Sequence, residues 1–227
     1  MIIYLDTETI PTEDPEAIAG IAAGIKPPAN YKKAETIASW EAHEKTAVVA
    51  EAVLKTAFDG TYGRIIVIGY AVDDAEPIAL MGAREDEILA QFFAAISAAA
   101  QYAFQGGNGE RLLTFAGHNL VGFDLRFLWQ RAVIHRVKMP GGLLKACKAK
   151  PWDSVVADTM QMWHPDRDKR ISLEKLCKAL GVPTSKNDLD GSKVYEAYKA
   201  GEIERIAQYC VGDVAAMREC FKRLTFQ

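Results

Sequence analysis

Short strand-like runs and longer helical segments alternate along this chain, and their order limits the folds available to it. Five runs combine apolar and β-branched residues over lengths typical of strands: Ile2–Leu5, Arg64–Val72, Pro77–Ala83, Arg111–Asn119 and Val155–Asp158. The second and third are joined by the short turn DDAE, which favours a hairpin. Because helical segments separate the later strands, the chain predicts an α/β fold with a mixed sheet.

Four segments have the composition or periodicity of helices: Glu85–Phe104, Phe123–Arg136, Ser172–Leu180 and Glu202–Leu224. The third has the clearest ends, because Ser172 suits the N-cap position and Gly181 suits a helix stop. A Pro-Gly-Gly sequence at Pro140–Gly142 predicts a loop after the second helix. The sheet is therefore expected to be flanked by helices.

The segment from Pro11 to about Tyr62 interrupts this pattern directly after the first strand. It is too long for a loop in a compact domain. Its part Glu35–Lys55 contains good helix formers and few breakers. We therefore expect a single domain over residues 1–227, with a helical insertion at about 11–62. The length of 227 residues suits one well-packed domain.

The overall composition excludes several classes of protein. The hydrophobic and charged fractions are those of an ordinary globular chain, and no apolar stretch is long enough to cross a membrane. The N-terminus lacks the features of a signal peptide. The cysteines form no Cys-x-x-Cys pair and no zinc spacing with histidine: Cys147, Cys177, Cys210 and Cys220. We expect reduced thiols in a cytoplasmic protein that does not associate with membranes.

Two carboxylates follow the first strand. Side chains two residues apart on a strand point to the same face, so Asp6 and Glu8 are expected side by side. Their charges repel unless a cation lies between them. The same spacing occurs at Asp14–Glu16 and Asp74–Glu76, but only the first pair directly follows a buried-looking run. Because a bare Asp-x-Glu is more often a solvated strand end, other groups must converge on the pair to make a site.

Two later segments carry further candidates. Asp124 lies at the start of a predicted helix, directly after Phe123 and five residues after Asn119. Taken alone, an aspartate there is an ordinary feature that the helix dipole favours. Tyr209 and Asp213 are four residues apart on the last predicted helix, so their side chains share a face roughly 6 Å apart.

In their order and contexts, these segments resemble the motifs of the DEDD superfamily of metal-dependent 3′–5′ exonucleases, in its tyrosine-containing DEDDy branch. The motifs are YLDTETIP, GHNLVGFD and YCVGD, the last with Tyr-x-x-x-Asp spacing. The chain looks most like the proofreading exonuclease domain of family B DNA polymerases, standing free. The similarity extends through LEKLCKALGVP and LDGSKVYEAY. It implies a ribonuclease H-like mixed sheet flanked by helices, and the insertion at 11–62 is longer than that minimal fold requires.

The resemblance implies a metal-dependent 3′–5′ exonuclease that hydrolyses phosphodiester bonds at the 3′ ends of single-stranded DNA and releases nucleoside monophosphates. Two divalent ions, Mg²⁺ or Mn²⁺, would activate water and neutralise the leaving oxygen, and such hard ions prefer carboxylate oxygens. The implied metal ligands are Asp6, Glu8, Asp124 and Asp213. Tyr209 would complete the catalytic set by orienting the attacking water.

The resemblance also implies contacts with the terminal nucleotide, from Thr7, Thr9, Ile10, Asn119 and Phe123. We interpret His118 as a structural residue and Asp158 as a capping or supporting residue. The segment Leu125–Trp152 is basic and contains no acid, which is typical of a track for a nucleic-acid strand but equally of a solvated helix face followed by a basic loop.

Several alternatives remain open at this stage. The same site would serve an exoribonuclease, because the sequence does not reveal how a 2′-hydroxyl is recognised. An inactive nucleic-acid-binding module with the same fold is a second alternative, although all four acids are present. A replication or repair protein that docks on the insertion around Trp40 is compatible with either.

Overall fold

The computed structural model describes residues 1–105, 113–150, 153–165, 169–184 and 189–227. Its elements are β1 (Ile2–Ile10), α1 (Pro15–Gly24), α2 (Ala34–His43), α3 (Lys45–Lys55), η1 (Thr56–Phe58), β2 (Arg64–Val72), β3 (Ile78–Met81), α4 (Glu85–Gln105), β4 (Thr114–Gly117), α5 (Asp124–Ile134), α6 (Gly141–Cys147), β5 (Val156–Asp158), α7 (Thr159–Trp163), α8 (Leu173–Leu180), η2 (Gly191–Lys193), α9 (Val194–Lys199) and α10 (Ile203–Leu224). The chain divides into two compact units. The first unit comprises Met1–Glu8 and Ile65–Gln227, and the second unit comprises Thr9–Arg64.

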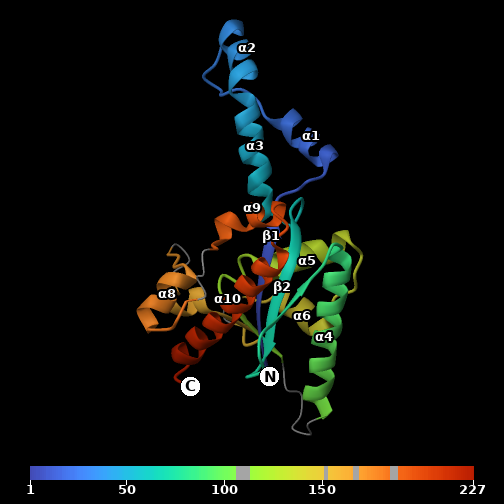
Figure 1. The fold of residues 1–227 in the computed structure, drawn as a ribbon, viewed down its shortest axis with the longest axis vertical. Coiled ribbons are helices and arrows are strands. Elements are labelled where there is room, and N and C mark those ends of the chain that lie inside the picture. The colour runs from blue at the N-terminus through green and yellow to red at the C-terminus, as the bar shows by residue number, and fades with distance from the viewer. Residues whose placement is uncertain (106–112, 151–152, 166–168, 185–188) are drawn as a thin grey trace. The chain divides into compact units, whose positions relative to one another are not determined.

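A five-stranded sheet in the order β3-β2-β1-β4-β5 forms the framework of the first unit. Strands β1, β4 and β5 are parallel, and β2 and β3 form the predicted antiparallel hairpin. The end of β2 lies beside the beginning of β1, because Asp73 donates its backbone N–H to the carbonyl of Ile2 (2.8 Å). This mixed sheet with its flanking helices is the α/β fold that the sequence predicts (Figure 1).

Helices cover both faces of the sheet, and successive residues of β1 serve two different cores. Ile3 and Leu5 belong to a core that includes buried residues of α4 and α5. Tyr4 belongs to the core on the other face, with Val214 and Phe221 of α10. Both faces of β1 are therefore buried, which explains why this strand is a continuous apolar run rather than an alternating one.

The boundaries of α8 and α10 follow from local sequence signals. The hydroxyl of Ser172 caps α8 by accepting the N–H of Lys175 (3.4 Å), and Gly181 ends that helix with a positive φ of 65°. Helix α10 spans Ile203–Leu224, close to the predicted range. The cap and the stop of α8 confirm the prediction made from Ser172 and Gly181.

Other element bounds differ from those predicted. Strand β1 extends to Ile10, because the residues beyond Leu5 remain paired or buried in place of forming a loop. Helix α6 begins at Gly141, so the predicted loop Pro140–Gly142 is wrong at its two glycines. Burial of Leu143 and Ala146 stabilises a helix that glycine in its first turn does not favour. Residues 111–112 of the predicted fourth strand lie outside the described residues.

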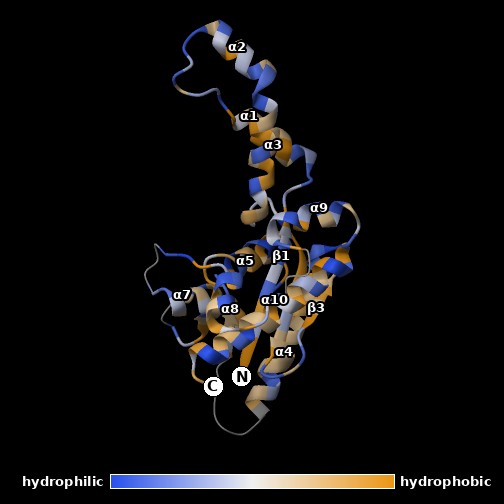
Figure 2. Cartoon of the chain, turned by 60° about the vertical axis from the view of Figure 1, so that its left-hand side comes forward, coloured by the Kyte–Doolittle hydropathy of each residue, from blue (hydrophilic) through white to orange (hydrophobic). Residues whose placement is uncertain are grey.

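The second unit is largely helical. It contains α1, α2, α3 and η1, and hydrophobic residues run along α3 (Figure 2). Helices α1 and α3 bury no residue, whereas Trp40 of α2 is buried. The N–H of Thr12 bonds to the hydroxyl of Thr56 (2.9 Å), which ties the start of this unit to its last helical turn. That the unit is an insertion within a single domain stays a prediction.

None of the helices in the described ranges combines the length and the hydrophobicity that a membrane-spanning helix needs.

Candidate active site

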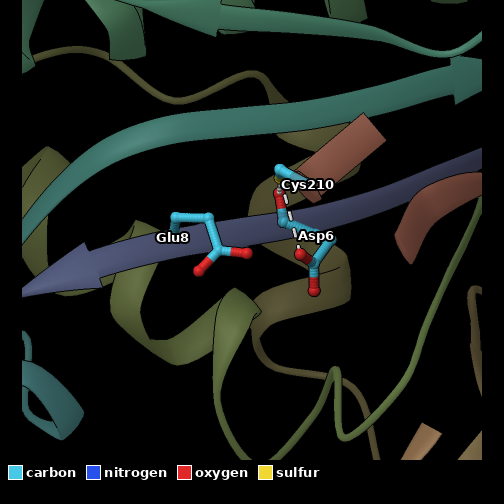
Figure 3. Close-up of side chains that lie close together, drawn as sticks. All are labelled: Asp6, Glu8 and Cys210. Carbon is cyan, nitrogen blue, oxygen red and sulfur yellow. Dashed lines mark hydrogen bonds between the residues drawn. The ribbon is translucent and has the colours of Figure 1, made fainter. Parts of the chain in front are cut away.

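The carboxylates of Asp6 and Glu8 lie on one face of β1, beside the thiol of Cys210 from α10. One ligand atom from each of these three residues lies within 4.8 Å of the other two (Figure 3). The two acids lie together as their spacing on the strand predicted. Glu8 is buried and Asp6 is half-buried, so the pair is not a solvated strand end.

Burial and mutual repulsion raise the pKa values of these two acids. Desolvation raises the pKa of Asp6 well above its usual range, and the carboxylates of Glu8, Asp124 and Asp213 raise it further. The pKa of Glu8 is also raised, first by desolvation and then by Asp213 and Asp124. The carboxylates therefore lie close enough to disfavour one another's charged forms.

Helix α5 begins with Asp124, whose carboxylate is bound to β1. Its Oδ1 atom accepts both the backbone N–H (3.0 Å) and the hydroxyl hydrogen (2.8 Å) of Thr7. Asp124 is 2% exposed, and this burial raises its pKa to about 7, although the Thr7 hydroxyl opposes the shift. Thr7 thus fixes the rotamer of Asp124 from a residue that lies 117 positions earlier in the chain.

Helix α10 carries Tyr209 and Asp213 one turn apart. Asp213 lies close enough to Tyr209 to raise the pKa of its phenol. The pKa of Tyr209 is raised, first by burial, then by the charges of Asp213 and Glu8, so the phenol keeps its proton at neutral pH. A cavity of about 210 Å³ lies beside both residues, and its wall includes Ser172 and Asp190.

The loop between β4 and α5 is shaped by Asp158. Its carboxylate accepts the backbone N–H groups of Asn119 (2.9 Å) and Val121 (3.1 Å), and it also caps α7 through the N–H of Met160. The capping role predicted for Asp158 is confirmed. The ring of His118 is engaged by a side-chain hydroxyl and a backbone carbonyl, which fits its interpretation as a structural residue.

The same loop places Asn119 and Phe123 before Asp124. Asn119 has a positive φ of 60°, and a Cβ built on Gly122 would lie only 2.5 Å from its side-chain oxygen. A side chain at position 122 would therefore displace the Asn119 amide from its present position. Phe123 is partly exposed and packs against Phe127 with 5.5 Å between ring centroids, which leaves part of its ring accessible.

Thr9 and Ile10, the remaining predicted nucleotide contacts, belong to the second unit. The Thr9 hydroxyl donates to the carbonyl of Ala57 (2.7 Å), and Ile10 is fully buried. These contacts lie within that unit, so a nucleotide contact by Thr9 or Ile10 stays a prediction.

The basic segment Leu125–Trp152 does not form one surface. Arg131 is buried in α5 and pairs with Glu85, with 2.7 Å between Nη2 and Oε2. Lys148 and Lys150 precede β5, so they lie toward the end of the sheet at which the parallel strands begin. Asp6 and Asp124 lie toward the opposite end, at which the parallel strands finish, so these lysines are separated from the carboxylates. A nucleic-acid track along the whole segment is therefore not supported.

The sequence analysis missed Cys210 as a residue of this site. Its thiol approaches the carbonyl oxygen (3.6 Å) and Oδ2 (3.5 Å) of Asp6. One local signal was available: Cys210 lies three residues before Asp213 on a helix, so both side chains lie on neighbouring parts of one face. That signal gave no reason to connect Cys210 with Asp6, which is 204 positions away.

The donor set fits a divalent cation of the Mg²⁺ type. The side chains that raise the pKa of Asp6 are other carboxylates, and this unrelieved repulsion is what a bound cation would remove. Carboxylate oxygens are the ligands that Mg²⁺ and Mn²⁺ prefer. Of the predicted ligands, Asp6 and Glu8 place ligand atoms within 4.8 Å of each other. That Asp124 and Asp213 complete the metal site stays a prediction.

The raised pKa values predict how the metal-free protein responds to pH. The pKa of Asp124 rises from the ordinary value of 3.8 to about 7 in the folded protein. The contribution of its carboxyl group to folding stability is therefore fully present below about pH 4 and is lost as the pH rises through 7. Asp124→Asn keeps an oxygen for the Thr7 bonds and removes the charge. In chelator, this variant should gain stability over the wild type as pH rises across that window, by at most about 4 kcal/mol.

Thermal melts at several pH values measure this difference, and Mg²⁺ should raise the melting temperature of the wild type more than that of Asp124→Asn. A difference between the two proteins that stays constant from pH 4 to pH 8 would show that Asp124 has an unshifted pKa.

Fold and site together define an α/β protein in which Asp6 and Glu8 of the central strand β1 lie near carboxylates from the helices α5 and α10 and near a tyrosine of α10. Residues 42–225 match a family described as "Predicted 3'-5' exonuclease related to the exonuclease domain of PolB". This span covers most of the chain, and the chain belongs to this family. Asp6 and Glu8 lie before the matched span.

Among solved structures, the fold is similar to the family B DNA polymerase from the hyperthermophilic archaeon Pyrobaculum calidifontis. The TM-score is 0.57 at 14% sequence identity, and the match covers 99% of this chain and 24% of the polymerase chain. This chain therefore spans about a quarter of the length of that polymerase, and the likeness shows a shared fold. No match was found among curated proteins.

Proposed function

We propose that this protein is a metal-dependent 3′–5′ exonuclease that hydrolyses phosphodiester bonds at the 3′ ends of single-stranded DNA and releases nucleoside monophosphates. The observation that carries the proposal is the convergence of carboxylates from three elements. Asp6 and Glu8 come from β1, Asp124 comes from α5 and Asp213 comes from α10. Glu8, Asp124 and Asp213 raise the pKa of Asp6, and Asp213 and Asp124 raise that of Glu8. Membership of a family of predicted exonucleases supports the same reaction.

Asp6, Glu8, Asp124 and Asp213 would hold two divalent ions, Mg²⁺ or Mn²⁺. When bound, such ions activate a water molecule and neutralise charge on the leaving oxygen. The chain itself contributes fixed ligand positions, because Asp124 is held by two hydrogen bonds from Thr7. Thr7 is therefore proposed as a residue that positions Asp124, in addition to its predicted contact with the nucleotide.

Tyr209 is proposed to orient the attacking water. Its phenol keeps its proton because burial and Asp213 raise its pKa, so it acts as a hydrogen-bond partner rather than as a general base. Asp213 is proposed to accept the phenol hydrogen and thereby to orient the phenol oxygen; its contribution to the raised pKa of Tyr209 supports this role.

Asn119 and Phe123 are proposed to contact the terminal nucleotide. Phe123 presents a partly exposed ring next to Asp124, and aromatic rings stack on bases without regard to sequence. The loop that carries both residues is held by Asp158, so their positions are set before a strand binds. A cytoplasmic location and a replication or repair partner stay predictions.

The direct test is digestion of single-stranded DNA and RNA oligonucleotides, labelled at the 5′ end, with Mg²⁺ or Mn²⁺. We expect a ladder of DNA products that shorten from the 3′ end, together with nucleoside monophosphates. A blocked 3′ end should prevent digestion, whereas the same block at the 5′ end should not. Chelator should stop the reaction, because every proposed ligand holds metal.

The other outcomes separate the alternatives. Faster digestion of RNA than of DNA would assign an exoribonuclease with the same site. Binding of DNA without products, with either metal, would assign an inactive binding module. Products that shorten from the 5′ end would contradict the proposed polarity.

A further inference from the structure

Cys210 is the residue of the site that the proposed hydrolysis does not use. It is fully buried and lies between two fixed groups. On one side its sulfur is 3.5 Å from Oδ2 of Asp6. On the other side, a Cβ built on Gly69 of β2 would lie only 2.7 Å from the sulfur. The absence of a side chain at Gly69 thus gives Cys210 its place against the sheet, and a larger residue there would displace the thiol.

The carboxylate of Glu8 is a third possible metal ligand beside the Cys210 thiol and the Asp6 carboxylate. It is 7% exposed, and within the described part of the chain no hydrogen bond or ion pair reaches its carboxylate. A buried carboxylate without a partner is costly, and it is stabilised when it coordinates a cation. Figure 3 shows the side chains of Asp6 and Glu8 on the same side of β1, with the thiol adjacent to Asp6.

The separation of the Cys210 sulfur and the Asp6 carboxylate is compatible with a tetrahedral zinc site, and Glu8 lies within reach of the same ion. Zinc lies about 2.3 Å from a thiolate and about 2.1 Å from a carboxylate oxygen, and a tetrahedral angle then separates sulfur and oxygen by about 3.6 Å. The observed separation of Sγ and Oδ2 is 3.5 Å, and all three ligand atoms lie within 4.8 Å of one another. Mg²⁺ gains nothing from sulfur, whereas Zn²⁺ and Cd²⁺ favour it.

We propose that Asp6, Glu8 and Cys210 form a binding site for a thiophilic divalent cation, of which Zn²⁺ is the physiological example. On binding, the Cys210 S–H bond breaks, its proton leaves to solvent, and a metal–sulfur bond forms. A fourth position remains for water or substrate, as in open zinc sites. Because Asp6 and Glu8 are shared, Zn²⁺ and Mg²⁺ exclude each other at this point. The idea that Zn²⁺ controls activity by excluding Mg²⁺ rests on the proposed function. Binding of Zn²⁺ by these three residues does not depend on it.

The wild-type protein allows the first test, since it needs no substitution. Crystals soaked with Zn²⁺ should give an anomalous difference peak between the three side chains, about 2.3 Å from the Cys210 sulfur. A peak bound only by carboxylates, or no peak between these residues, would overturn the proposal.

Solution measurements use Cd²⁺, because its bond to a thiolate absorbs in the ultraviolet. The sulfurs of Cys177 and Cys220 are 3.5 Å apart and form a second thiol pair, so the background protein carries Cys177→Ala and Cys220→Ala. In this background Cd²⁺ should give a thiolate absorption band that excess Mg²⁺ suppresses. Adding Cys210→Ser should remove the band and weaken Cd²⁺ binding by roughly 10–100-fold or more.

The matched control is Cys147→Ser in the same background, because the Cys147 thiol contacts Leu125 and Met139 instead of the site. It should leave the band intact. A band that survives Cys210→Ser would overturn the proposal, with circular dichroism used to verify that each variant is folded. If the band is present but no metal supports hydrolysis, the proposed function fails and this inference stands. If Mg²⁺ supports hydrolysis but Cd²⁺ gives no thiolate band, this inference fails and the proposed function stands.

Discussion

Replacing Asp6 and Asp124 together by asparagine should abolish hydrolysis while leaving the protein folded. Each substitution removes a negative charge that would hold metal, yet it keeps the size of the side chain. The amide that replaces the Asp124 carboxylate also retains an oxygen for the two Thr7 hydrogen bonds. Loss of a single electrostatic stabiliser typically costs about 10²–10³-fold in rate, so the double variant should show no products. Initial rates with end-labelled single-stranded DNA and Mg²⁺ measure the effect.

The chain offers a matched control in its other Asp-x-Glu sequences. Asp74 belongs to such a pair, lies in the turn after β2 and forms an exposed ion pair with Lys222. Asp74→Asn should therefore keep the wild-type rate and change stability little, because solvent screens an exposed ion pair. If the double variant degrades DNA as fast as Asp74→Asn does, the carboxylates of Asp6 and Asp124 are not the site.

Tyr209→Phe should slow turnover by roughly 10²–10⁴-fold, the range associated with loss of a positioned group that assists proton transfer. The substitution removes the phenol oxygen and leaves the ring packed on α10. Since the substitution leaves the charge of Asp213 in place, metal binding should persist. Single-turnover rates and Mn²⁺ titrations separate the two properties.

The pH profile distinguishes a water-orienting phenol from a general base. Because the pKa of Tyr209 is raised, its titration lies outside the neutral range, and Tyr209→Phe should lower the rate equally at every pH from about 6 to about 9. If Tyr209 were a general base, the wild-type rate would change with pH across this range, and Tyr209→Phe would remove that pH dependence. Tyr102→Phe is the control, since Tyr102 is 75% exposed on α4, and it should change nothing.

The buried pair of Arg131 and Glu85 shows where a surface prediction from composition fails. Glu85 Oε1 accepts both the N–H of Ile65 (2.8 Å) and Nε of Arg131 (2.9 Å), so the pair joins the beginning of β2 to α5. Arg131 belongs to a segment with seven basic residues and no acid, which gave it the appearance of a solvent-facing charge. Its partner lies 46 residues earlier, so no local pattern identifies it.

Local periodicity in the sequence was sufficient for much of the framework. The two-residue period of a strand places Asp6 and Glu8 on one face, and the helical period places Tyr209 one turn from Asp213. Ser172 and Gly181 determine the ends of α8 through hydrogen bonding and backbone freedom within a few residues. These features depend on backbone geometry that is the same in any protein, so they can be predicted from a single sequence.

Only the tertiary structure decided which of these groups meet. Thr7 bonds to Asp124 because β1 and the start of α5 come together at one edge of the sheet. Cys210 reaches Asp6 because Gly69 has no side chain to keep α10 away from β2. Contacts of this kind depend on how closely distant elements pack, and packing is set by the volumes of many side chains at once. The sequence by itself therefore determined the candidate acids and their local faces, whereas packing decided their partners and their raised pKa values.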